Sequence, residues 1–234
     1  MRIQAKRLLL LVLVLASAVP TVVLAASDYS LFGDATLVSP GNASPTAVQL
    51  RSSETVPPKF AGVAFDIPAG TTFAEILNIS SDYEFIAGSC GGGSPRFQIN
   101  LTDGPNSGNI FVYLGPSPNY TGCPPNVWLN TGDLAAPANL VDTSQLPLGT
   151  FYDPYASAQT RYGSYTITGI QLVVDGYWFA GTQTMLVDNV MINDTIYTFE
   201  GVHSCKEDGW QQFTSAPGPF KNQGDCVSYF SRNK

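Results

Sequence analysis

The chain has 234 residues, of which 44% are apolar, 12% aromatic and 12% charged, and it contains four cysteines and a single histidine. Its net charge of −7 argues against nucleic acid and anionic membranes as partners, because both attract clustered lysine and arginine. Since His203 is the only histidine, a serine–histidine–aspartate triad at any other position is excluded.

The first 25 residues have the order of a secretory signal peptide. Three basic residues precede an apolar run over residues 8–16, and small side chains follow at Ala25 and Ala26. We predict cleavage after Ala25, which leaves a secreted or cell-surface protein with 8 basic against 18 acidic side chains, a net charge of −10. The alternative is a membrane anchor, because residues 8–24 reach the lower limit for a spanning helix.

Frequent glycine and proline divide residues 26–200 into short pieces, as in all-β domains. Asn193 and Asp194 predict a two-residue hairpin turn, and only residues 72–77 have the pattern of a short helix. Without crossover helices, we expect an all-β domain, an antiparallel β-sandwich or jelly roll. The predicted strands cover residues 47–51, 62–67, 96–101, 109–114, 164–168, 170–175, 184–192 and 195–199.

Two long segments, residues 115–125 and 129–162, resist assignment as strands, and loops of this length are usually functional or stapled. Several aromatic rings lie in or beside such glycine- and proline-rich segments. Flat rings exposed on loops stack on the apolar faces of sugars, whereas the alternative is that they cover the ends of the sandwich as ordinary core. The predicted ligand-binding rings are Trp128, Tyr152, Tyr155, Tyr177 and Trp178.

Within this set Trp178 is the predicted stacking ring. Two glycines bracket three consecutive aromatic residues in the segment 176–181, and successive side chains cannot all point into one core. We expect at least one ring of this segment to face solvent or the other aromatic loop, residues 151–162.

Four cysteines behind a signal peptide predict two disulfides, and spacing favours the local pairs Cys90–Cys123 and Cys205–Cys226. A zinc site is the alternative, but the spacing of its ligands is absent. No lysine follows glycines 91–93, so a phosphate-binding loop is excluded. We predict instead a flexible turn in which other parts of the chain can come close to the backbone around a disulfide. We expect residues 201–234 to form a small appended hairpin stapled by the second disulfide.

Asp188 lies in an apolar stretch that predicts a strand, on the same face as Leu186 and Val190. A carboxylate is costly to bury unless it meets a cation or several hydrogen-bond donors. Calcium is one candidate, because it prefers hard oxygen ligands. The other is a set of backbone N–H donors near a bulge.

The sequence Leu-Val-Asp-Asn-Val at residues 186–190 resembles the terminal strand of jelly-roll carbohydrate-binding modules. This resemblance implies a sugar-binding sandwich and a structural Ca²⁺ held by Asp188, with partners in the loops around Asp34 and Asn42. The tail resembles a Cys-Lys-x-x-Gly-Trp…Phe-Lys-Asn-Gln-Gly-Asp-Cys-Val-Ser element of secreted bacterial proteins, matched between Cys205 and Ser228. It implies a bacterial cell-surface or extracellular protein and brings no activity with it.

Three functions are compatible with these patterns. The favoured hypothesis is an exported, non-catalytic binding or adhesion module for an extracellular glycan. The alternatives are a structural cell-envelope protein and a polysaccharide hydrolase or lyase. A hydrolase would need two carboxylates about 5–10 Å apart in a cleft, and a lyase a constellation such as Tyr162 with Arg161. The sequence singles out no such carboxylate pair.

Overall fold

The computed structural model describes residues 29–206, 208–213 and 218–232. The predicted signal peptide, residues 1–25, lies outside the described residues. In the described part of the chain, no helix is both long and apolar enough to cross a membrane.

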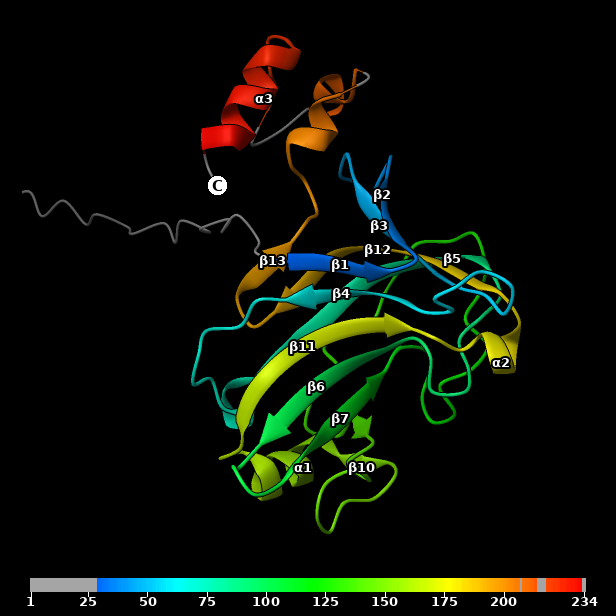
Figure 1. Ribbon diagram of the computed structural model, residues 1–234, viewed down its shortest axis with the longest axis vertical. Coiled ribbons are helices and arrows are strands. Elements are labelled where there is room, and N and C mark those ends of the chain that lie inside the picture. The colour runs from blue at the N-terminus through cyan, green and yellow to red at the C-terminus, as the bar shows by residue number, and fades with distance from the viewer. Residues whose placement is uncertain (1–28, 207, 214–217, 233–234) are drawn as a thin grey trace, which may run out of the picture.

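Two antiparallel sheets form a sandwich, as predicted (Figure 1). Sheet A has the order β1–β4–β11–β6–β7 and sheet B the order β2–β3–β12–β5–β8, with β13 paired to β12. The strands of sheet A are β1 (Tyr29–Gly33), β4 (Ala61–Phe65), β11 (Thr166–Val174), β6 (Arg96–Thr102) and β7 (Ser107–Tyr113). Those of sheet B are β2 (Ala35–Val38), β3 (Ala47–Ser52), β12 (Gln183–Ile192), β5 (Ile79–Ala87), β8 (Leu129–Asn130) and β13 (Thr195–Tyr197).

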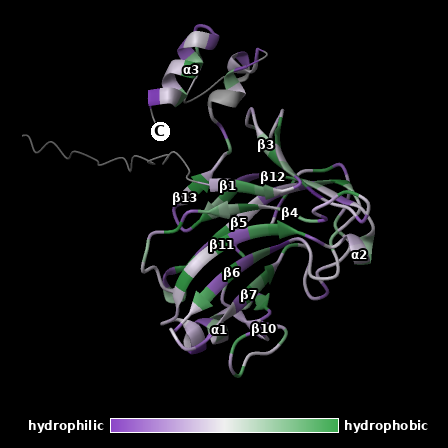
Figure 2. Cartoon of the chain, viewed as in Figure 1, coloured by the Kyte–Doolittle hydropathy of each residue, from purple (hydrophilic) through white to green (hydrophobic). Residues whose placement is uncertain are grey.

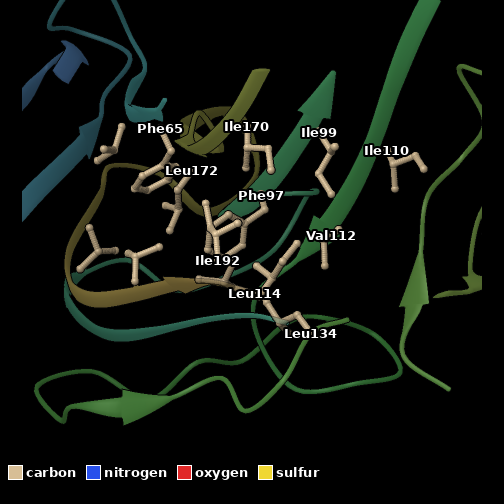
Figure 3. Packing of buried hydrophobic residues seen from close by; sticks show 14 of the residues in the cluster. Phe65, Phe97, Ile99, Ile110, Val112, Leu114, Leu134, Ile170, Leu172 and Ile192 are labelled. Carbon is tan, nitrogen blue, oxygen red and sulfur yellow. The ribbon is translucent and has the colours of Figure 1, made fainter. Parts of the chain in front are cut away.

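The core lies between the two sheets (Figure 3). The strands of sheet A carry both hydrophobic and hydrophilic residues (Figure 2). Apolar and polar residues alternate along β6, where Phe97 and Ile99 are buried while Gln98 and Asn100 are half-buried. This period of two is what a sheet with one buried face requires. Leu50 and other inward residues of sheet B belong to the same buried cluster, so one continuous core holds the sandwich together.

The predicted strands are present, with differences at bulges. The strands predicted at residues 164–168 and 170–175 are parts of one strand, β11 (Thr166–Val174), whose register shifts between Ile167 and Gly169. The hairpin turn is confirmed: Ile192 pairs with Thr195, and Asn193 takes a left-handed φ of 52°.

The helices differ more from expectation. The short helix predicted at residues 72–77 is the 3₁₀ turn η1 (Phe73–Glu75), which begins in a capping box between Thr72 and Glu75. The segment 129–162, predicted as a loop, contains the small pair β9 (Leu140–Val141) and β10 (Asp153–Pro154) and ends in α1 (Tyr155–Tyr162). A second short helix, α2 (Tyr177–Ala180), occupies the aromatic segment.

The tail beyond residue 200 forms a small helical unit, at the top of Figure 1. It contains η2 (Val202–Cys205), η3 (Gly209–Gln212) and α3 (Gln223–Arg232). Helices therefore stand where a hairpin was predicted, and Asn222 caps α3 by accepting a hydrogen bond from the Asp225 N–H. Phe213 and the disulfide form its own small core, and the Ser204 hydroxyl hydrogen bonds to the Thr46 hydroxyl of the sandwich.

The first and last parts of the sandwich meet at one edge. The ring of Tyr29, on β1, contacts the ring of Phe199, just after β13, edge-on at 5.1 Å between centroids. In Figure 1 this edge lies opposite α2.

Candidate functional site

The predicted rings fall into three classes of exposure. Trp178 and Tyr152 are exposed, at 65% and 50%, whereas Tyr177 and Trp128 are half-buried. Trp128 precedes β8 at the edge of sheet B. The prediction that Tyr155 is a surface ring is wrong, because α1 turns it fully into the core, where its hydroxyl donates to the Ile76 carbonyl.

Trp178 and Phe179 form an exposed pair of rings on α2, with centroids 5.9 Å apart, and we call this pair the platform. It rests on the glycine-rich loop beside Cys90. A Cβ atom built on Gly91 would lie 2.4 Å from the Phe179 ring, and one on Gly92 would lie 2.7 Å from Phe179 Cβ. Only glycine therefore permits this seat, which confirms the predicted close approach.

Both predicted disulfides are present, with Cα–Cα distances of 5.3 Å for Cys90–Cys123 and 5.7 Å for Cys205–Cys226. The first one anchors the glycine-rich loop directly below the platform. Disulfides of this kind are typical of proteins that mature in an oxidising compartment.

A row of rings continues from the glycine-rich loop to the second aromatic loop. A Cβ on Gly93 would lie 3.4 Å from the Tyr113 ring, which packs 5.5 Å from the ring of Tyr120. Tyr120 stacks on Tyr152 at 6.1 Å and 10° between planes, and Tyr152 contacts Phe151. Tyr113 and Tyr120 are buried, whereas Tyr152 and Phe151 at the far end of the row are exposed. Two buried tyrosines thus connect the glycine-rich loop below the platform to the loop that carries Tyr152.

Polar side chains line the outer face of sheet A next to this row. Arg96, which pairs with Tyr113 across β6 and β7, forms two hydrogen bonds of 2.7 and 2.8 Å with the Asp175 carboxylate. Its guanidinium also lies 4.9 Å from the centre of the Phe111 ring. The alternation of polar residues in β6 could have revealed this face from the sequence, whereas pairing with Asp175 depends on tertiary structure.

Tyr113 donates a hydrogen bond of 2.8 Å to Asp142. Burial, and secondly this hydrogen bond to a carboxylate, raise the pKa of Tyr113 above its usual range. The phenol therefore stays neutral and serves as a donor, not as a base.

Arg161 and Tyr162 are both engaged in local structure. The Arg161 guanidinium binds the Asp153 carboxylate, and the buried Tyr162 hydroxyl donates to the Pro147 carbonyl. This pair therefore stabilises the loop after β9 and gives no support to lyase chemistry.

Asp188 is fully buried beside a bulge in β12. Asn189 has a left-handed φ of 45°, and this extra residue moves Val190 to the core face that Val187 also occupies. The prediction that Asp188 and Val190 share a face is therefore wrong, because the bulge resets the alternation.

Hydrogen-bond donors surround the Asp188 carboxylate. Oδ2 accepts from the Asn42 N–H at 2.8 Å and from the Ser44 hydroxyl, and Oδ1 accepts from the Asn189 N–H at 2.8 Å. Burial raises the pKa of Asp188 to about 7 against these donors, and the charge of Asp82 adds to the effect. Burial and the neighbouring Asp188 raise the pKa of Glu200 to about 7 as well.

These contacts fit a hydrogen-bonded carboxylate and do not fit a calcium cage. The side-chain amides of Asn42 and Asn189 both donate hydrogen bonds to Asp82 Oδ2. A Ca²⁺ ion would instead need several oxygen atoms that point toward one centre. Among the described residues, no group of three His, Cys, Asp or Glu side chains could hold a metal ion.

Asn42 lies beside Asp188 as expected, but Asp34 does not. Asp34 contacts Arg51 at 3.9 Å, and Arg51 pairs with Thr184, four residues before Asp188. Along a strand this separation is roughly 13 Å. The expected pairing of Asp34 with Asp188 around a metal is therefore wrong.

The protein is thus an antiparallel β-sandwich with an exposed aromatic platform and a polar sheet face. Among solved structures, the chain is similar to the family 11 carbohydrate-binding module of a cellulosomal cellulase of Clostridium thermocellum, with a TM-score of 0.39 and 14% identity over 70% of this chain and 84% of that one. The module in complex with a β-1,3-1,4-mixed-linked tetrasaccharide gives a TM-score of 0.39 and 13% identity over 70% and 85% of the two chains. An exo-β-agarase gives 0.35 and 13% over 70% of this chain and 24% of its own. No protein-family model matches the chain, and no curated protein does.

Proposed function

We propose that this protein is an exported, non-catalytic carbohydrate-binding module that holds an uncharged glycan on the platform of Trp178 and Phe179. One observation carries the proposal: two large rings are 65% and 57% exposed although they are seated tightly on a disulfide-anchored glycine loop. Exposed apolar surface of this kind marks interaction sites. Flat aromatic faces match the apolar faces of sugar rings.

Rigid seating supports binding in a second way. A side chain that is already held in its bound position loses little conformational entropy when a ligand arrives. The Tyr152 ring at the other end of the row is also exposed, and Gln98 and Asn100 place amide groups on the outer face of sheet A. This combination of flat rings and planar polar groups suits a hydroxyl-rich, uncharged ligand.

The charge of the sandwich favours an uncharged ligand over an acidic one. Between residues 29 and 200 the only cationic side chains are Arg51, Lys59, Arg96 and Arg161. The three arginines pair with aspartates, and the Lys59 amine lies 5.3 Å from the centre of the Tyr177 ring. An anionic polysaccharide would therefore meet an acidic surface whose cations already have partners.

A glycan array with the mature protein tests the proposal, and neutral and uronic or sulfated glycans should be compared at the same ionic strength. We expect neutral glycans to bind and Trp178→Ala to lose this binding. Leu77→Ala is the matched control, because Leu77 is 69% exposed on the turn after η1. A preference for anionic glycans, or release of reducing sugar from the bound glycan, would contradict the proposal.

A further inference from the structure

Gln183, the first residue of β12, is a fully buried amide between α2 and the glycine-rich loop. Its Nε2 donates to the Ser89 carbonyl at 2.7 Å, at the start of this loop. Its Oε1 accepts from the Ser94 hydroxyl at 2.9 Å, at the end of the loop, and from the Gly176 N–H, also at 2.9 Å. One side chain thus joins both ends of the glycine-rich loop to Gly176, the residue that precedes α2.

The geometry leaves no room for another arrangement at this junction. A Cβ on Gly176 would lie 2.7 Å from Gln183 Oε1 and 2.8 Å from Ser94 Cβ. Gly176 is the N-cap of α2, and its carbonyl accepts from the N–H groups of Phe179 and Ala180. The Gln183 amide therefore holds the N-cap of α2, and the Ser52 hydroxyl accepts from the N–H of the next residue, Tyr177.

The same network reaches the polar sheet face. The Ser94 hydroxyl, which donates to Gln183, accepts from the Asp175 N–H at 3.0 Å. The Asp175 carboxylate in turn holds Arg96. Gly176 at the start of α2 is thus connected to Arg96 through the side chains of Gln183 and Ser94 and through Asp175.

We propose that Gln183 is a positioning residue that fixes the platform rings over Gly91 and Gly92 and thereby sets the affinity of the platform for its glycan. The second half of this statement rests on the proposed function, whereas the first half concerns the rings alone. A buried amide with a merely structural role would change the stability of the sandwich without changing the local motion of Trp178 in the folded protein.

The test therefore measures the motion of Trp178 directly. The chain has three tryptophans, so Trp128→Phe and Trp210→Phe leave Trp178 as the single indole. In this background Gln183→Met keeps the length of the side chain and removes its hydrogen bonds. We expect the fluorescence anisotropy of Trp178 to gain a nanosecond decay component, and the affinity for the best array glycan to fall at least about tenfold.

Gln159→Met is the matched control, because Gln159 Nε2 donates to a backbone carbonyl, that of Ile76, away from the platform. Ser94→Ala, which removes one donor to Gln183 Oε1, replaces Gln183→Met if that variant does not fold, and should give the same component. An unchanged Trp178 decay in a folded variant would overturn the proposal whether or not a glycan is known. A changed decay with unchanged glycan affinity would instead overturn the link between positioning and binding.

Discussion

Gly92→Ala tests whether the seat of the platform needs glycine. Gly92 has a φ of +62°, and a Cβ there would lie 2.7 Å from Phe179 Cβ and 3.2 Å from the Trp178 ring. Gly132 has nearly the same φ, +66°, with nothing within 4 Å of the added atom. The two alanine variants therefore share the backbone penalty and differ in the contact with the rings.

The left-handed conformation costs about 1–2 kcal/mol for alanine, so Gly132→Ala should lower the free energy of unfolding by this amount. In Gly92→Ala the rings must also move, and forcing atoms into a packed contact adds about 1–3 kcal/mol. Because Trp178 and Phe179 are exposed, part of this strain is relieved when the platform lifts off the loop. We therefore expect glycan affinity to fall in Gly92→Ala and to be unchanged in Gly132→Ala.

Urea denaturation gives the two stabilities, and calorimetric titration gives the two affinities. If the two variants show equal losses of stability and equal affinities, the contact between Gly92 and the platform has no energetic role. This result would refute the reasoning.

Further predictions concern the ligand ring, the buried carboxylate, the disulfide and the leader. Trp178→Ala should weaken glycan binding by roughly 1–3 kcal/mol and barely change the melting temperature, since the ring is mostly exposed; a large loss of stability would show that the ring is core. The pKa of Asp188, about 7, lies above its ordinary value of 3.8, so the folded state retains a proton that the unfolded chain releases. Stability should therefore fall as the pH rises from about 5 to about 8, and Asp188→Asn should reduce this slope; a slope of the opposite sign would contradict the assignment. EDTA should leave the melting temperature unchanged, and a drop would restore the calcium prediction for Asp188. Replacing Cys90 and Cys123 by serine removes a disulfide with a sequence separation of 33 and should lower the free energy of unfolding, measured by urea denaturation, by roughly 4 kcal/mol. An unchanged midpoint would show that the loop is held in place without the disulfide. Intact mass of the exported protein should show cleavage after Ala25, whereas a retained Met1 would indicate an anchor.

Local alternation was sufficient to predict most of sheets A and B. β6 and β7 follow it closely, because each has one face in the core and one outside. β5 was missed, since its start, Ile-Ser-Ser-Asp, resembles a loop although its serines are buried. The helix α1 was missed as well. Tyr155, Ala158 and Tyr162 are buried at helical spacing, but the helix has only two turns, and so short a segment shows little periodicity.

The candidate site could be predicted only in part. A run of three aromatic residues between glycines was enough to indicate that at least one of the rings is exposed, and Trp178 and Phe179 both are. It could not indicate which of the surrounding segments would seat them, because the contacts of Gly92 with the rings and of Gln183 with Gly176 exist only in the tertiary structure. A bulge was one of the two alternatives for burying Asp188, and asparagine tolerates the left-handed φ of 45° found at Asn189. Its position in the strand depends on the register between β12 and β5, which the local sequence does not give.

The contact between Tyr29 and Phe199 has a topological consequence, because it brings the two ends of the sandwich side by side. A short linker from residue 200 back to residue 29 would close the sandwich into a ring, and the ring could then be opened at Gly122, an exposed loop glycine whose added Cβ would meet nothing within 4 Å. Circular permutation is tolerated at sites of this kind. For the same reason the sandwich could be inserted into a loop of a host protein, because its two connections to the host would lie side by side at residues 29 and 199. The helix α2 would then point away from the host (Figure 1).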